Sequence, residues 1–291
     1  MTGIAIKRSG AERLLRSLLT HKVGLIGAVI VLTAIILAVA APYIAPFEPG
    51  QRHLAHRFTP PIWVEGGRDG YLLGTDQHGR DILSRIMFGA RISLVVGIAA
   101  VVLSSVVGLL LGLASGFAGG IIDIVIMRTV DAMLAIPTIL FMLVIVLVVG
   151  SGLWPLIAVI GATNWVSYTK LVRGEVLSVR ERDYVKAARA GGAGLPRILR
   201  RHIIPNIFSA FVVISTLNVG SVILAESSLS FLGLGIQPPD LSWGQMLSDG
   251  RQYLATSWWI ATFPGLAITI TVLGIMFLGD WLRDYLDPRL P

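Results

Sequence analysis

The chain has 291 residues, a net charge of +7 and no cysteine. Hydrophobic residues make up 54% of it and charged residues only 14%, against about 25% charged residues in soluble domains, and the mean hydropathy is +0.77. This composition excludes an ordinary soluble protein and indicates a membrane protein, and the missing cysteines exclude disulfides, thiolate catalysis and thiolate zinc sites.

Six apolar stretches are each long enough to cross the hydrocarbon core of a bilayer, which is about 30 Å thick. Only helices and closed barrels satisfy their backbone groups in lipid, and these stretches show no strand alternation, so they predict helices. The predicted spans are residues 23–41, 93–114, 132–149, 153–168, 207–225 and 258–278. We therefore expect an all-α membrane protein in which a segment 1–22 precedes one transmembrane domain, residues 23–291.

The distribution of lysine and arginine predicts which side of the membrane each segment occupies. Segment 1–22 holds five basic residues and loop 170–206 holds nine, whereas segment 226–257 carries only Arg251. Both basic segments are predicted to be cytoplasmic, together with both termini. The outer loop 42–92 carries six basic and five acidic residues, which is too balanced to decide its side.

The outer loop contains the sequence Gly74-Thr75-Asp76-Gln77-His78-Gly79-Arg80-Asp81, which predicts a turn followed by a helix. Its two glycines allow a tight backbone, and Asp81 can cap a helix that begins at Ile82. Asp76, His78 and Asp81 also offer three ligands to a metal ion. Mixed ligands on one turn are weak evidence for a metal, so no metal site is predicted.

Polar and small residues inside the spans suggest how the helices meet. Gly108, Gly112 and Gly116 repeat every four residues and predict close approach of another helix. Asn164, Asn218 and Ser221 are candidates to line a path for a solute, because polar groups are rare at membrane depth. Hydrogen bonding between helices, at about 0.6 kcal/mol per bond, explains these three residues equally well.

The basic segment between the fourth and fifth spans is the most informative part of the chain. Asp183 is a good helix N-cap and Gly191-Gly192 a helix stop, which predicts a helix of about two turns. One narrow face of this helix carries a tyrosine and small residues, namely Tyr184, Ala187, Ala188 and Gly191. Such a face can enter a groove of another protein; the alternative is a solvated basic loop.

This segment resembles the cytoplasmic coupling loop of bacterial ABC-importer permeases, whose pattern is EAA, three residues, G, nine residues, then IxLP. Lys186-Ala187-Ala188 take the place of EAA, Gly192 that of the glycine, and His202 to Pro205 that of IxLP. The lysine and the histidine depart from the pattern, and both departures are similar to the dipeptide, oligopeptide and nickel branch. Further motifs at residues 73–97, 231–247 and 279–290 are similar to the same branch.

The resemblance implies a type I ABC-importer permease fold with six transmembrane helices in the bacterial inner membrane. It implies half of a translocation pathway for di- or oligopeptides, with nickel or another small solute as the alternative. The implied partners are a homologous second permease subunit, two cytoplasmic ATPase subunits that bind ATP and Mg, and an extracytoplasmic solute-binding protein; neither a nucleic acid nor a cofactor of the chain's own is implied. The expected coupling residues are Tyr184, Ala187, Ala188, Arg189, Gly192 and Pro205.

The residues themselves argue against an enzyme. None of the four lysines completes the GxxxxGK motif, with Ser or Thr after the lysine, that holds nucleotide phosphates. All five histidines fall outside the predicted spans, which removes a membrane serine protease from consideration. An ion-coupled secondary transporter is a weaker alternative, because such proteins usually carry carboxylates near the membrane midplane.

Overall fold

The computed structural model describes residues 10–286, and this part of the chain is helical apart from its loops and one isolated bridge between Thr75 and Asp81. Residues 1–9 of the predicted cytoplasmic segment and the end of the motif 279–290 lie outside the described residues. The α-helices are α1 (Gly10–Thr20), α2 (Lys22–Ile44), α3 (Ile82–Ala118), α4 (Gly120–Leu134), α5 (Thr138–Val149), α6 (Leu153–Arg180), α7 (Asp183–Ala190), α8 (Leu195–Ile198), α9 (Ile204–Phe231), α10 (Trp243–Gly250) and α11 (Trp259–Leu286). Short 3-10 turns lie at Leu54–His56 and Arg251–Tyr253, and a π-helical turn, Leu199–Ile203, joins α8 to α9.

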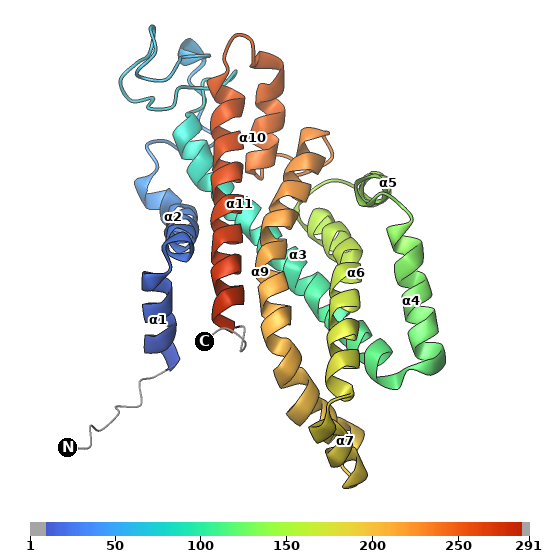
Figure 1. Cartoon of the computed structure of the whole chain (residues 1–291). Helices are drawn as coiled ribbons and strands as arrows, with labels where there is room; N and C mark the ends of the chain where they lie inside the picture. The colour runs from blue at the N-terminus through green and yellow to red at the C-terminus, as the bar shows by residue number, and fades with distance from the viewer. Residues whose placement is uncertain (1–9, 287–291) are drawn as a thin grey trace, which may run out of the picture.

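The long helices form one bundle with distinct ends (Figure 1). The loop that follows α2 and the short helix α10 lie at one end, and α7 lies at the other. Helices α4 and α5 form an arm at the side of the bundle, beyond α6.

Four helical stretches in the described part of the chain are long and apolar enough to cross a membrane: α2, α3, the run Leu195–Phe231, and α11. A fifth crossing exists if α4 and α5 together count as one bent span. Helix α6 also has 28 residues, but its second half carries several charged side chains, and these lower its mean hydropathy. The predicted number of six spans is therefore not confirmed.

The prediction of one continuous span over residues 132–149 is wrong. Helix α4 ends at Leu134, α5 begins after Pro137, and the two are bent by 90°. Proline has no amide hydrogen to donate and forces the preceding residue, Ile136, away from helical geometry. The prediction followed hydropathy alone, which is high on both sides of this proline.

The predicted glycine stripe is the contact between α3 and α6, the most extensive helix pair in the bundle. A Cβ atom on Gly112 would lie 2.6 Å from Cβ of Val172, and one on Gly116 would lie 2.8 Å from Cβ of Val176. A Cβ atom on Gly108 would collide with Tyr168. Only glycine allows the two backbones to come this close, so the packing prediction is confirmed.

Candidate functional sites at the two ends of the bundle

Helix α7 has the predicted length but begins one position earlier than predicted. Its N-cap residue is Arg182, and Asp183 is already inside the first turn, where its negative charge suits the positive end of the helix dipole. At the other end Gly192 has φ of +81°. The amide of Gly192 donates to the carbonyl of Arg189 and that of Ala193 to the carbonyl of Ala188, each at 3.0 Å. This is a Schellman motif, and it confirms the predicted glycine stop.

Val185 attaches α7 to the rest of the chain. Its side chain is fully buried in a cluster with three valines of α6 and three isoleucines that follow α7, namely Val172, Val176, Val179, Ile198, Ile203 and Ile207. The sequence analysis missed this residue. Val185 is the one large aliphatic side chain in α7, so its apolar character was the signal that could have identified it.

The remaining coupling candidates lie at the surface. Ala187 and Tyr184 are exposed, Tyr184 by 42%, and Ala188 is half-buried. The ring of Tyr184 lies 5.9 Å from the ring of His202, measured between centroids. The structure therefore presents the small-residue face of α7 to the outside, while Val185 holds the helix from within.

Two basic side chains of α7 bind to their own chain. Cζ of Arg189 lies 5.7 Å from the centre of the Phe117 ring near the end of α3, which is a cation–π contact. Nζ of Lys186 lies 3.2 Å from Oε2 of Glu181, and its hydrogen bond lowers the pKa of that exposed carboxyl. Pro205 is exposed in the first turn of α9, where its missing amide hydrogen costs nothing.

The three candidates for a solute path differ in their surroundings. Asn164 lines a small cavity of about 50 Å³ between α6 and the break between α4 and α5, and neither Asn218 nor Ser221 lines it. Asn218 is half-buried and neighbours the buried hydroxyl of Tyr168, while Ser221 is exposed. The Tyr168 hydroxyl makes no hydrogen bond of good geometry within the described part of the chain.

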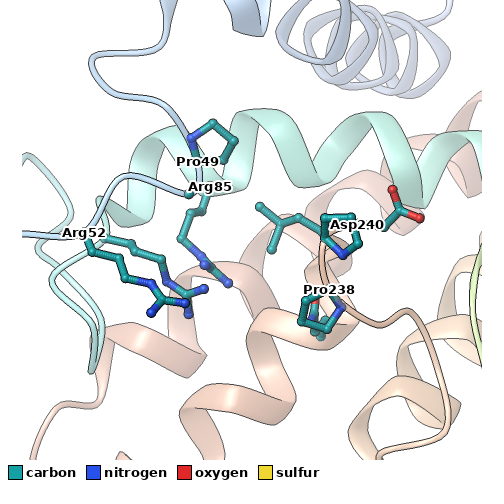
Figure 2. Close-up of a pocket in the computed structure, with 10 residues that line it drawn as sticks. Pro49, Arg52, Arg85, Pro238 and Asp240 are labelled. Atoms are coloured by element: carbon teal, nitrogen blue, oxygen red, sulfur yellow. The ribbon is translucent and has the colours of Figure 1, made fainter.

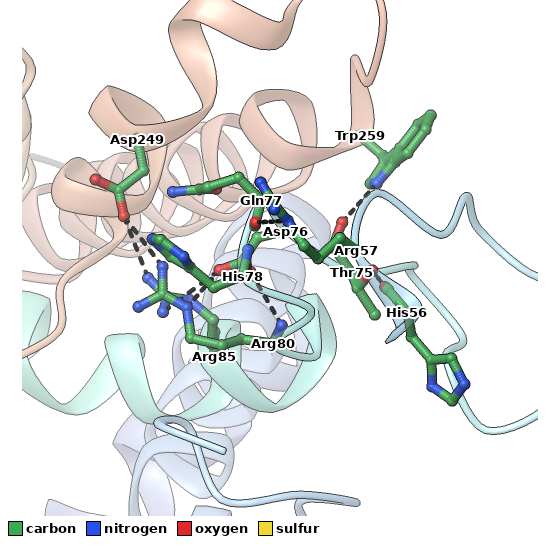
Figure 3. A network of polar contacts seen from close by, with 10 residues as sticks. All are labelled: His56, Arg57, Thr75, Asp76, Gln77, His78, Arg80, Arg85, Asp249 and Trp259. Atoms are coloured by element: carbon green, nitrogen blue, oxygen red, sulfur yellow. Dashed lines mark hydrogen bonds and ion pairs between the residues drawn. The ribbon is translucent and has the colours of Figure 1, made fainter. Parts of the chain in front are cut away.

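At the opposite end, the turn from Thr75 to Asp81 is held by a network of charges (Figure 3). Oδ1 of Asp76 accepts hydrogen bonds from the amides of His78 and Arg80, at 2.8 and 3.0 Å. Oδ2 of Asp76 lies 2.6 Å from Nε of Arg80 and 3.6 Å from Nη1 of Arg85. Both arginines also pair with Asp249 of α10, at 3.6 and 3.5 Å. Two carboxylates and two guanidinium groups thus tie the turn, α3 and α10 together.

The predicted cap of α3 is confirmed. Oδ2 of Asp81 accepts hydrogen bonds from the amide and the hydroxyl of Ser84, at 2.7 and 2.6 Å. The carbonyl of Thr75 in turn accepts from Nε1 of Trp259, at 3.0 Å, which joins the turn to α11. Among residues 10–286, the three metal-ligand candidates of this turn do not gather into a group that could hold a metal ion.

Comparisons with known proteins identify relatives over almost the whole chain. Residues 108–290 match the family described as "Binding-protein-dependent transport system inner membrane component", and residues 11–61 match the "N-terminal TM domain of oligopeptide transport permease C". The chain is 42% identical over 271 residues to the di/tripeptide transport system permease protein DppC of Pseudomonas aeruginosa, which covers 93% of this chain and 89% of that protein. It is 44% identical over 270 residues to the dipeptide transport system permease protein DppC of Escherichia coli, which covers 93% and 90%.

A solved structure has a similar fold. A chain of the MetNI methionine ABC transporter, in an inward-facing conformation, superposes with a TM-score of 0.55 at 21% identity. The match covers 66% of this chain and 91% of the MetNI chain. At this identity the likeness concerns the fold alone.

Proposed function

Because the chain belongs to the family of binding-protein-dependent transport system inner membrane components, we propose that it is the permease subunit of an ATP-driven importer for di- or oligopeptides. The observation that carries the proposal is its identity of 42 and 44%, over 93% of its length, to permeases named for di/tripeptide and dipeptide transport. In this proposal ATP and Mg bind to two separate cytoplasmic ATPase subunits, and a solute-binding protein delivers the peptide from outside.

The chain would supply half of the pathway in the inner membrane, and a homologous second permease subunit the other half. Large apolar side chains are exposed along the helices, among them Leu147, Val148 and Phe208. Apolar surface of this kind needs lipid or a partner subunit to cover it. The half-buried Asn218 and the exposed Ser221 on α9 are candidates to face the solute, and Asn164 of α6 is the third candidate.

Helix α7 would be the coupling helix, in a cytoplasmic loop 170–206, with both termini on the same side of the membrane. Its small-residue face enters a groove of the ATPase. Val185 joins α7 to α6, and the contact between Arg189 and Phe117 joins it to the end of α3. A movement of the ATPases is thereby passed to the two most extensively packed helices of the bundle, which shifts the permease between inward-facing and outward-facing states.

The substrate is proposed to be a peptide and not nickel, because the carboxylates of the outer turn already have partners in the protein. Asp76 pairs with two arginines, and Asp81 caps α3. The test compares uptake of labelled alanylalanine and of nickel in a strain without other peptide importers, with and without this gene. We expect deletion to abolish dipeptide uptake and the restored gene to return it. Loss of nickel accumulation with unchanged dipeptide uptake would contradict the assignment.

Replacing Ala187 with tryptophan is expected to disrupt assembly with the ATPase subunits. The side chain at this position is exposed on the face turned away from Val185, so the variant should still fold and insert. Overfilling a close-packed contact costs about 1–3 kcal/mol, which corresponds to a loss of affinity of about 5- to 150-fold. The measurement is co-purification of the ATPases with the tagged permease, at equal amounts of permease in the membrane.

The matched control is Ala187→Ser, which keeps a small side chain and should assemble normally. If the tryptophan variant assembles and transports as well as the serine variant, α7 does not dock through this face.

A further inference from the structure

A cavity of about 440 Å³ lies at the outer end of the bundle (Figure 2). Its walls come from the loop after α2, the start of α3, the loop before α10, and α10 itself. Arg52, Arg80 and Arg85 all line it, and Figure 2 shows the Arg85 side chain reaching from α3 into the space between Pro49 and Pro238. The carboxylate of Asp240, which also lines the cavity, points away from Arg85 and Arg52.

The arginines around the cavity differ in whether a carboxylate pairs with them. Arg80 and Arg85 share the two carboxylates of Asp76 and Asp249, so these four groups balance. Arg52 lies at the same cavity and forms no ion pair with any described residue. Arg52 is therefore the one guanidinium group of this wall without an ion pair, and the carboxylate of Asp240, which is in no ion pair with a described residue either, points away from it.

The buried arginine is held only loosely by its counterions. The side chain of Arg85 is 4% exposed, and its two ion pairs measure 3.6 and 3.5 Å. Charge-assisted hydrogen bonds between guanidinium and carboxylate are shorter, at about 2.7–2.9 Å. Burial also raises the pKa of the Asp249 carboxyl, although Arg85 and Arg80 oppose the rise. Of its five N–H donors, Arg85 uses one in a hydrogen bond, to Asp249 at 3.5 Å.

The same wall contains an unpaired acceptor. Oε1 of Gln245 is buried and has no hydrogen-bond partner among residues 10–286, and Gln245 lines the cavity. A buried carbonyl oxygen without a donor destabilises the folded state, and a ligand that supplies the donor removes this penalty. The loosely held guanidinium groups and the residue that carries this unpaired carbonyl oxygen therefore line one cavity. A ligand with a carboxylate and a neighbouring N–H group would offer acceptors to the guanidinium groups and a donor to Oε1 of Gln245.

We propose that this cavity binds the C-terminal residue of the incoming peptide, on the outer side of the membrane. The carboxylate pairs with the guanidinium groups of Arg52 and Arg85, and the adjacent peptide N–H donates to Oε1 of Gln245. Planar guanidinium groups match a carboxylate in shape as well as in charge. The volume lies within the range of about 300–1,000 Å³ that is usual for small-ligand sites. This inference rests on the proposed function, and it adds a site that receives the peptide after its release from the binding protein.

Variants of Arg52 and Gln245 can distinguish a role of the cavity in peptide binding from a role in the stability of the fold. The charge network that holds the turn and α10 consists of Asp76, Arg80, Arg85 and Asp249. Arg52 is exposed and takes part in none of these pairs, and only the backbone amide of Gln245 bonds to the Ser242 cap of α10. Changes to the two side chains therefore leave the network intact.

The test uses the complete transporter with its second permease, ATPases and binding protein in vesicles, and it follows uptake of labelled alanylalanine. We expect Arg52→Ala and Gln245→Leu each to lower the uptake rate about tenfold at subsaturating peptide. The control Arg68→Ala removes an exposed arginine of the same outer loop that does not line the cavity, and it should leave uptake unchanged. The concentration of loaded binding protein that half-maximally stimulates ATPase activity should be the same in all variants.

Two results overturn the proposal. If uptake by both cavity variants equals that of the wild type, the cavity binds no carboxylate. If the variants instead raise the concentration of binding protein needed for stimulation, Arg52 and Gln245 contact the binding protein and not the peptide. If the wild-type transporter takes up no peptide, the proposed function itself is contradicted. This result differs from both results above, so failure of the peptide site can be distinguished from failure of the proposed function.

Discussion

Replacing Gly112 with leucine is expected to leave almost no folded protein in the membrane. A Cβ atom at this position would lie 2.6 Å from Cβ of Val172 and 3.0 Å from the carbonyl oxygen of Thr169, so a leucine has no space. Overpacking typically costs about 1–3 kcal/mol, and more where backbone blocks the new side chain. A loss of this size is a large part of the total stability of about 5–15 kcal/mol that is usual for proteins.

The measurement is the amount of protein in the membrane and the melting temperature of the solubilised complex. Gly174→Leu is the matched control, because Gly174 lies in α6 and no heavy atom is within 4 Å of a Cβ atom built there. This control should accumulate normally. Equal melting temperatures for the two variants would show that α3 and α6 do not depend on the close approach at Gly112.

Replacing Asp76 with alanine is the second change with a large expected effect. It removes one of the two counterions that Arg80 and Arg85 share, together with the acceptor for the amides of His78 and Arg80. Asp76 and Arg85 are 3 and 4% exposed. Loss of one partner from a buried ion pair costs about 3–5 kcal/mol, because a charge is left without compensation.

We expect this variant to melt at a clearly lower temperature and to be cut by added protease in the loop between α2 and α3. Asp69→Ala is the control, because Asp69 is exposed in the same loop and pairs with no described arginine or lysine. Unchanged melting and protease resistance of Asp76→Ala would mean that the network contributes nothing measurable to stability.

Features that depend on neighbouring residues in the sequence were predictable. The cap at Asp81 needs only a side-chain acceptor before a helix, and the stop at Gly192 needs only a residue that tolerates positive φ. The glycine stripe of α3 was predictable for a similar reason, since a repeat of four places small residues on one helix face. In each case the physical cause lies within a few residues of the feature.

Features that depend on distant parts of the chain were not predictable. Asp249 joins Arg80 and Arg85 only because α10 folds over the start of α3, and nothing near Asp249 in the sequence indicates this. The first turns of α3 carry Arg85 and Arg91, so hydropathy placed the start of the span at Ser93, whereas the helix begins at Ile82. Hydropathy indicates which residues favour lipid over water. A helix, in contrast, continues for as long as its backbone hydrogen bonds form, whether or not lipid surrounds it.

Helix α6 runs without interruption from Leu153 to Arg180, and its 28 residues correspond to a rod of about 42 Å at about 1.5 Å per residue. A rod of this length acts as a lever. A tilt of about 5° around its midpoint would move each end by about 2 Å, in opposite directions. Its C-terminal end carries α7, and its N-terminal end begins directly after the side arm of α4 and α5. A small displacement at one end of α6 is therefore converted to one of similar size at the other end, without rearrangement of the side chains between them.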